Sequence, residues 1–413
     1  ANNTKAHGVS NGINSVISAA NGGNANAQAI LDGKLAVQVK LKHNNRFYTN
    51  EGFQFKVSTE VGMHALTVGY RDMEDSESRY QEYECFDQSA SGVNSALYSC
   101  GTGYTGSNNR LRESEATSYY IEDKITLGDL VVTIGHRSEE YDQVENRWDD
   151  GTPTRTQLNS SYPKTKDGDY TSTGFGATYD LNENMQLVAG FHEGMTAMFG
   201  ADPETADNME LGIRYSEGMS DLEVFYFQSD YESLKAACTN SQGGACDDGD
   251  IFDGGAVDVS GVEVSGSMIV EGDNGTSYPI GLTYTSTDAS FANSFDDDGE
   301  YWGVVAAGDD VPYVPDSSLA LVAGFVSSNG LSGNVRWVKN GSACSTAACG
   351  TNQTIDAHSF VDLNLRKALN ENVDIYVGVE NLLDDEDVVA RAPKDGARSQ
   401  KPRTMKVGFA LNF

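Results

Sequence analysis

The last ten residues, TMKVGFALNF (404–413), alternate strictly between two kinds of side chain. A period of two is typical of a β-strand with one apolar face and one polar face. The apolar face would hold Met405, Val407, Phe409, Leu411 and Phe413, and the other face Lys406, Gly408, Ala410 and Asn412. Such a strand fits a transmembrane β-barrel, whose outer face meets lipid. The terminal phenylalanine resembles the signal by which outer-membrane proteins are recognised for assembly.

The same alternation occurs upstream, at residues 361–366 and 373–380. The tripeptide Asn-Glu-Asn at 370–372 predicts a tight turn between these two strands, and it recurs at 182–184. Other short connections are expected at 127–129, 217–221 and 327–330. Long polar segments separate them, at 74–112, 141–168, 193–207, 234–254, 288–311, 340–355 and 384–402. Short turns that alternate with long loops are typical of a transmembrane barrel.

About fifteen or sixteen strands are expected. They lie near 52–60, 64–73, 113–124, 129–140, 169–181, 185–192, 208–217, 221–233, 255–267, 277–287, 300–306 or 312–325, 330–339, 356–368, 373–383 and 403–413. Residues 35–60 keep one parity and fit either one long strand or two strands joined at 44–52. Residues 1–34, rich in Asn, Ala, Gly and Ser, indicate a low-complexity loop or disordered segment. The predicted domains are therefore 1–34 and an all-β, antiparallel barrel portion at 35–413.

Composition agrees with a barrel. The 413 residues include 44 Gly and 20 Tyr but only 8 Pro. A mean hydropathy of -0.44 is too polar for a helical membrane protein, and no apolar run reaches the ~18 residues that a spanning helix needs. The net charge of -33 excludes nucleic acid as an expected partner, because a binder must neutralise phosphates with basic side chains. No signal peptide precedes Ala1, which indicates a mature chain or a fragment.

Six cysteines occur as three near neighbours in stretches rich in small polar residues. They are Cys85 with Cys100, Cys238 with Cys246, and Cys344 with Cys349. Local pairs at long loops favour three disulfides formed in an oxidising compartment, although six cysteines allow fifteen pairings. A zinc site is not indicated, because no CxxC or HxxxH spacing occurs.

Eight phrases between about Asn44 and Phe413 resemble TonB-dependent outer-membrane receptors, most closely the ferric-citrate-type branch. In order they are 45–48 (NRFY), 64–71 with 75–79, 134–139, 202–204 (DPE) leading to 210–215 (ELGIRY), 261–263 (GVE), 308–315 (GDDVPYVP), 379–384 (VENLLD) and 401–404 (KPRT). Most of these residues are expected to set barrel geometry and not to touch a ligand.

The resemblance implies a barrel of 22 strands in the outer membrane of a Gram-negative bacterium, filled by a separate plug. Such a receptor imports an iron chelate, driven by the TonB–ExbB–ExbD complex through the plug, and the iron is cargo, so no resident cofactor is expected. Nothing before Asn44 resembles a plug. The chain is therefore expected to be a fragment without the plug and the first six or seven strands.

In ferric-citrate-type receptors arginines hold the anionic chelate, which suits a planar, permanently charged guanidinium. The positions that align with this region are Arg79, Arg110 and Arg112, and Arg391 and Arg398 in the last loop would complete a basic ring with Lys394. The alternative is that these residues pair with nearby carboxylates, Glu74, Asp75, Glu77 and Glu113 among them. The acidic net charge counts against an anion receptor, because it repels anions at long range.

Other functions are weaker readings of the same residues. A sixteen-stranded general porin fits the strand count and is the main alternative. No enzyme is expected, because no GxSxG occurs and no histidine has an evident catalytic companion. The acidic runs 247–250 and 296–298 lack EF-hand spacing and indicate solvated loops more than calcium sites.

Overall fold

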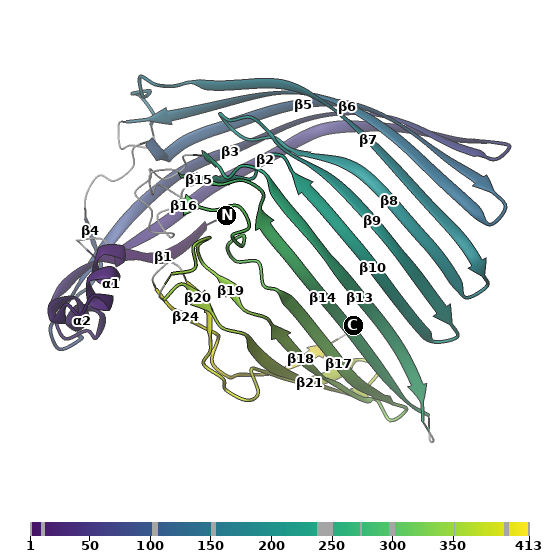
Figure 1. Ribbon diagram of the computed structural model, residues 1–413. Coiled ribbons are helices and arrows are strands. Elements are labelled where there is room, and N and C mark those ends of the chain that lie inside the picture. Colours follow the sequence, from purple (N-terminus) through teal and green to yellow (C-terminus); the bar gives the residue numbers. More distant parts are fainter. Residues whose placement is uncertain are drawn as a thin grey trace.

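The computed structural model describes residues 2–9, 13–100, 106–149, 154–237, 251–272, 275–296, 302–350, 352–391 and 396–411. It contains a 17-stranded sheet, four two-stranded ribbons and two short helices. The sheet is strongly curved, and the small ribbons lie toward one end of it (Figure 1). An all-β fold built on one large antiparallel sheet therefore confirms the predicted fold class.

Fifteen main strands follow one another in the sheet, each pairing antiparallel with the next along the chain. The first five form what we call the tall wall: β2 (Val37–Val61), β3 (His64–Gln88), β5 (Gly106–Leu127), β6 (Leu130–Trp148) and β7 (Lys164–Asn182). The next five are β8 (Met185–Thr196), β9 (Glu204–Glu217), β10 (Ser220–Tyr231), β13 (Val257–Glu271) and β14 (Thr276–Phe291). The last five form the short wall: β17 (Ser317–Ser327), β18 (Leu331–Asn340), β21 (His358–Asn370), β22 (Val373–Glu380) and β25 (Thr404–Leu411).

The remaining strands are short or lie beside the main ones. Strand β1 (Asn2–Val9) pairs with the start of β2, and β4 (Tyr98–Ser99) with the end of β3. The ribbons are β11 (Lys235–Ala237) with β12 (Ile251–Asp253), β15 (Phe295–Asp296) with β16 (Val304–Val305), β19 (Ala343–Cys344) with β20 (Thr354–Ile355), and β23 (Val388–Ala390) with β24 (Arg398–Ser399). Within the described residues, no pairing joins β25 to β1 or β2.

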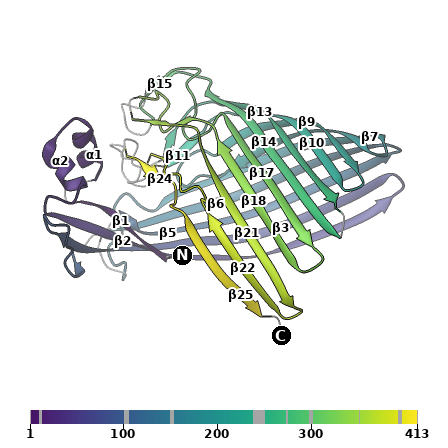
Figure 2. The ribbon, with the colours of Figure 1, turned by 90° about the horizontal axis from the view of Figure 1, so that it is seen from below.

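Short turns gather at one end of the sheet and long connections at the other (Figure 2). The turn between β2 and β3 needs only Gly62 and Met63, and Gly62 has a φ of 63°, which favours glycine. The β5–β6 turn uses Gly128 in the same way, at a φ of 67°. The expected turn at 370–372 joins β21 to β22, and the one at 182–184 joins β7 to β8. The long connections carry all four ribbons.

Apolar side chains share one face of the sheet. Residues directly opposite each other across two strands lie on the same face, and Val407 lies opposite Val377 as Phe409 lies opposite Ile375. Met405, Val407 and Phe409 are 68–70% exposed. The same face carries aromatic contacts, with the Tyr70 and Tyr119 rings 4.9 Å apart. Large apolar residues that remain exposed belong against lipid, so this is the outer face, in agreement with the predicted parity.

The tall-wall strands are longer than the sequence predicted. Segments 74–112 and 141–168 were predicted as loops, but β3 continues to Gln88 and β6 to Trp148. This prediction is wrong for those strand ends. Above the lipid neither face needs to be apolar, so the alternation that reveals a strand is missing there. The open question over residues 35–60 is answered by β2, which is one strand, and β17 occupies the expected 312–325 region.

The segment predicted as a loop or as disorder also differs. Helices α1 (Ile13–Asn21) and α2 (Ala25–Leu31) lie within residues 1–34. The Asn24 side chain caps α2 by accepting a hydrogen bond from the Ala27 amide at 3.0 Å. Alanine-rich, low-complexity sequence forms helix when a cap and packing support it, and Ala27 and Val16 are buried. Among the described residues, no helix is long and apolar enough to cross a membrane.

Two of the three predicted disulfides are present. Cys85, at the end of β3, is bonded to Cys100, and Cys344 is bonded to Cys349. Cys238 and Cys246 lie outside the described residues. A buried apolar cluster lies at this same end, where Val257 of β13 and Phe291 of β14 pack with Val305 and Trp302 from the β14–β17 connection. The long connections are therefore folded over one another.

Candidate functional site

Four arginines lie directly opposite one another across four neighbouring strands. Arg46 on β2 lies opposite Arg79 on β3, which lies opposite Arg110 on β5, which in turn lies opposite Arg147 on β6. We call this set the arginine row. Like charges directly opposite each other in a sheet destabilise it. The row therefore requires compensation from neighbouring groups.

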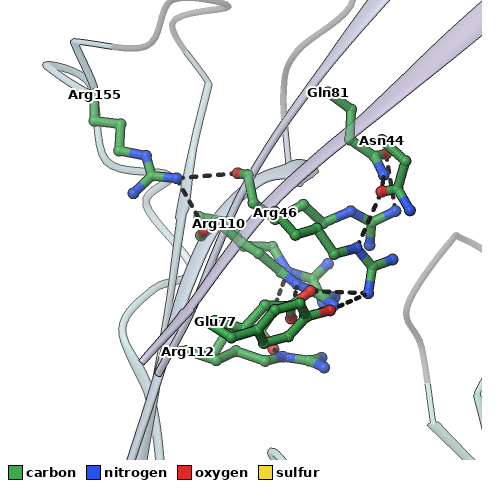
Figure 3. A network of polar contacts seen from close by, with 11 residues as sticks. Asn44, Arg46, Glu77, Gln81, Arg110, Arg112 and Arg155 are labelled. Carbon is green, nitrogen blue, oxygen red and sulfur yellow. Dashed lines mark hydrogen bonds and ion pairs between the residues drawn. The ribbon is translucent and has the colours of Figure 1, made fainter. Parts of the chain in front are cut away.

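Two glutamates closer to the short turns, Glu77 and Glu145, provide that compensation, and Figure 3 shows Glu77 beside Arg46 and Arg110. Glu77 Oε2 accepts from Arg110 Nη2 at 2.8 Å and Nε at 3.2 Å, and Glu77 Oε1 lies 3.0 Å from Arg46 Nη1. Glu145 Oε2 accepts from Arg112 Nε at 2.5 Å, and its Oε1 accepts from Arg147 Nε. Each carboxylate therefore joins two arginines, one through each oxygen. The result is two triads, Arg46–Glu77–Arg110 and Arg112–Glu145–Arg147.

The centre of this cluster is buried. Arg79 and Arg110 are 6% and 5% exposed, and Glu145 is 4% exposed. Burial and the charge of Arg112 lower the pKa of Arg110, against the opposing effect of Glu77. Burial acts to raise the pKa of Glu145, but Arg112 and Arg147 outweigh it, and that pKa lies below its usual value. Both groups therefore keep their charges at neutral pH.

The connection from β6 to β7 is anchored over the row by Arg155. Its Nη2 donates to the backbone oxygens of Arg79 and Arg110, each at 3.0 Å, and its Nε donates to Asn109 Oδ1 at 2.9 Å. The guanidinium also lies over the Trp148 ring, 4.7 Å from its centre. Arg155 thus ties its loop to two strands where their pairing ends.

Two arginines keep donors available. Arg112 and Arg147 both meet Glu145 through Nε, and their Nη groups have no polar partner in the described part of the chain. Arg112 stacks on Phe199 and Arg147 on Tyr162, with 4.9 and 5.0 Å between guanidinium carbon and ring centre. Their side chains are 17% and 12% exposed. Aromatic contacts and a shared carboxylate hold both guanidinium groups in place, with their paired N–H groups free to bind an anion.

The outer face of the same wall carries the opposite charge. Five exposed carboxylates lie directly opposite one another across β2, β3, β5, β6 and β7: Glu51, Glu74, Glu115, Asp142 and Asp167. We call this set the acidic row. Because successive residues in a strand point to opposite faces, the parity of Glu74 and Arg79 places the acidic row outside and the arginine row inside. The two rows thus lie on opposite faces of the sheet and five residues apart along each strand, which is a further ~17 Å.

The structure brings together three of the predicted ligand residues, Arg79, Arg110 and Arg112. It also shows their carboxylate partners, which the sequence offered as the alternative reading. The predicted Arg391 and Arg398 lie in the β22–β25 connection, where Arg391 Nε donates to the Thr354 carbonyl at 2.8 Å and Arg398 is exposed. No contact among the described residues joins these two to the arginine row, and Lys394 is outside the described residues.

Sequence reasoning missed four members of the cluster: Arg46, Arg147, Arg155 and Glu145. The signal for three of them was available, because the tight turns at Gly62 and Gly128 fix which residues face each other across each hairpin. Counting back from those turns places Arg46 opposite Arg79 and Arg147 opposite Arg110. Among the described residues, no group of three or more His, Cys, Asp or Glu side chains could hold a metal ion.

Comparisons with known proteins agree with this architecture. Residues 4–382 match the family described as "TonB dependent receptor-like, beta-barrel". The ferric citrate transporter FecA has a similar structure, with a TM-score of 0.64 at 18% identity over 91% of this chain and 56% of its own. The ferric-catecholate import receptor Fiu from E. coli K12 gives 0.62 at 18% identity, over 92% of this chain and 54% of that chain. The ferric yersiniabactin uptake receptor FyuA from Yersinia pestis has a TM-score of 0.62 at 13% identity, over 92% of this chain and 58% of its own.

The chain thus spans little more than half the length of these structures. At identities below 20% the likeness shows a shared fold. No curated protein matches the chain in sequence.

Proposed function

Since this chain belongs to the family of TonB-dependent receptor-like β-barrels, we propose that it is the barrel portion of an outer-membrane receptor that imports an anionic iron chelate of the ferric-citrate type. Energy would come from TonB, through a plug that fills the barrel. The lipid of a Gram-negative outer membrane would surround the apolar outer face. The iron is cargo bound within the chelate.

The arginine row carries this proposal. The chain has a net charge of -33, yet four arginines, joined by Arg112 and Arg155, gather around only two glutamates on the inner face of the tall wall. The acidic row on the outer face accounts for part of the opposing charge. Charge at a distance is screened within ~8 Å at physiological ionic strength, so an anion inside the barrel responds mainly to the arginines. This removes the objection that the acidic composition raised.

The geometry suits a ligand with several carboxylates. The Nη groups of Arg112 and Arg147 present paired donors, and the flat guanidinium matches a carboxylate with two parallel hydrogen bonds. Arg46, 26% exposed at its side chain, would add a third cation from β2. Arg79 and Arg110 are buried. They would act through their charge and by holding the triads in place. Arg391 and Arg398 are proposed as a second group of cations that approaches the same ligand from the last loop.

A general porin remains the less favoured alternative, because residues 4–382 match the receptor family. The similar structures are a transporter, an import receptor and an uptake receptor, which is consistent with a non-enzymatic role.

The test measures ferric citrate binding to the purified full-length receptor. Arg112→Ala and Arg147→Ala should each weaken binding by one to two decades, because each removes a charged hydrogen bond of ~1.5 to 3 kcal/mol. Arg112→Lys should fall between wild type and alanine, since lysine keeps the charge but loses the fork. Arg214→Ala is the matched control: it removes an exposed arginine, paired with Glu223, near the short turns. Unchanged affinity in both alanine variants would contradict the anionic ligand and favour a neutral or cationic chelate.

A further inference from the structure

We propose that Glu77 and Glu145 are internal competitors for the anion site: they occupy the arginines while the receptor is empty, and an incoming polyanion displaces them. Their presence would make the site select ligands that carry several closely spaced anionic groups over single carboxylates. This inference rests on the proposed function and adds how the site discriminates among anions.

The two glutamates are placed as a ligand carboxylate would be. Each uses its two oxygens for two different arginines, which lie on its own strand or on a directly neighbouring strand. Glu77 on β3 joins Arg46 on β2 to Arg110 on β5, and Glu145 on β6 joins Arg147 on its own strand to Arg112 on β5. A bridging carboxylate of this kind occupies the geometry that a guanidinium pair offers to an external anion.

A ligand with several carboxylates should displace the glutamates more readily than a ligand with one. A glutamate fixed on a strand acts at an effective concentration in the millimolar range or above, because it is tethered beside its partners. A free monocarboxylate therefore displaces it only at similar concentrations. A ligand with several carboxylates can engage Arg112 and Arg147 through their free Nη groups before Nε is released. Further carboxylates then bind intramolecularly, so displacement proceeds stepwise.

The alternative role is structural. The glutamates would then hold the arginines in their binding geometry, and removing the glutamates would weaken the binding of every anion. The two roles predict opposite signs for the same substitutions. Glutamine keeps nearly the same shape and one accepting oxygen but has no charge, so it ceases to compete while it still contacts an arginine. Glu77→Gln and Glu145→Gln therefore separate the two roles.

The experiment measures acetate and citrate binding to the full-length receptor by calorimetry, with ferric citrate as a third probe. Glu145→Gln should raise citrate affinity about tenfold, the scale of one charged hydrogen bond. The affinity for acetate should rise by a larger factor, so the preference for citrate over acetate should fall. Glu77→Gln should change binding in the same direction. The combined variant should bind acetate most strongly of all.

The matched control is Glu139→Gln. Glu139 lies on the same strand and face as Glu145 and pairs with Arg137 at 2.5 Å. Six residues along a strand separate it from Glu145 by ~20 Å, more than two Debye lengths at physiological ionic strength. The Glu139→Gln substitution removes the same charge without freeing a member of either triad, so it should leave citrate and acetate affinities unchanged. A gain equal to that of Glu145→Gln would attribute the effect to overall charge and overturn the proposal.

Weaker or unchanged citrate binding in both glutamine variants, while Arg112→Ala still lowers it, would overturn the competitor role and leave the proposed function standing. Absence of citrate and ferric citrate binding to the wild type would overturn both. Should a glutamine variant fail to assemble, Glu145→Asp retains the charge but shortens its reach by one methylene. It should raise citrate affinity by a smaller factor, and a decrease would contradict the proposal.

Discussion

The tall wall and the short wall follow the same rule of alternating faces but differ in height. Strands β2 and β3 have 25 residues each, whereas β22 and β25 have 8 each. A barrel strand needs only ~9 to 11 residues to cross a membrane. The short-wall strands, with 8 to 13 residues, are close to that length, whereas the tall wall carries a surplus above the lipid. The arginine row and the acidic row both lie on this part of the tall wall, beyond the length that a strand needs to cross the membrane.

The largest expected effect distinguishes outward positions on the two walls. Val407→Arg, at the middle of β25 on the lipid face, should reduce the free energy of unfolding by ~2 to 4 kcal/mol, because a cation is buried in hydrocarbon. Glu74→Arg on β3 also faces outward, but above the lipid, and it relieves repulsion in the acidic row. It should be neutral or stabilising. Urea titration of the receptor in lipid vesicles measures both, and equal losses would show that the tall wall is embedded to its full height.

The disulfide on the tall wall should stabilise the protein more than the disulfide on the short wall. Cys85 and Cys100 on the tall wall close a loop of 15 residues, and Cys344 with Cys349 close one of 5. In the chain-entropy account, replacing the first pair with serine should cost ~3 kcal/mol and replacing the second ~2 kcal/mol. Unfolding of the two double variants in vesicles provides the comparison. A larger loss for the short-wall pair would show that native packing, and not loop closure, sets the effect.

Glu145 should make the stability of the tall wall depend on pH. Its folded pKa lies below the usual 4.5 because of Arg112 and Arg147. A depressed acid stabilises the fold above the unfolded pKa, and that contribution is lost as the pH falls through the folded pKa. Glu145→Gln should therefore cost ~1.5 to 3 kcal/mol at pH 7. The difference from wild type should shrink below pH 4.5, and a difference that grows on acidification would contradict this account.

The smallest effect tests the acidic row. Glu74→Gln removes one of five facing carboxylates and should raise the free energy of unfolding by ~0.2 to 1 kcal/mol, the scale of a cross-strand charge pair. The gain should diminish with added sodium chloride, because exposed charges are screened. Glu371→Gln, in the β21–β22 turn of the short wall, is the control. An equal gain there would show that total charge is responsible and not the row.

The sequence predicted the short wall better than the tall wall. On β25 and β22 every second residue faces lipid, so alternation is continuous and the strands, their parity and the turn between them follow directly. The ends of β3 and β6 were missed because Ser, Asp, Glu and Tyr follow no alternation once both faces meet water. Helices α1 and α2 were missed because their support comes from a cap and from packing. The expected 22 strands of the intact barrel remain a prediction.

The candidate site shows a different limit. Arg79, Arg110 and Arg112 were identified by their alignment with a family's ligand region, and the structure brings them together. Glu77 was among the nearby carboxylates that the sequence offered as partners, whereas Glu145 follows only from counting across the β5–β6 hairpin to Arg112. Arg155 could not be found by either route: it reaches the row from a loop, at a φ of 53° that sequence does not reveal.

The neighbour-to-neighbour pairing of the sheet has a consequence for how the barrel assembles. Each main strand bonds to the strand that follows it in the chain, so ordered structure can grow by one hairpin at a time and never requires two distant segments to meet first. The turns at Gly62 and Gly128 close loops of two residues, for which the entropy of closure is small. Low contact order of this kind favours rapid nucleation at many points along the chain. The slow step would then be the single non-local event, the meeting of the two edges of the growing sheet.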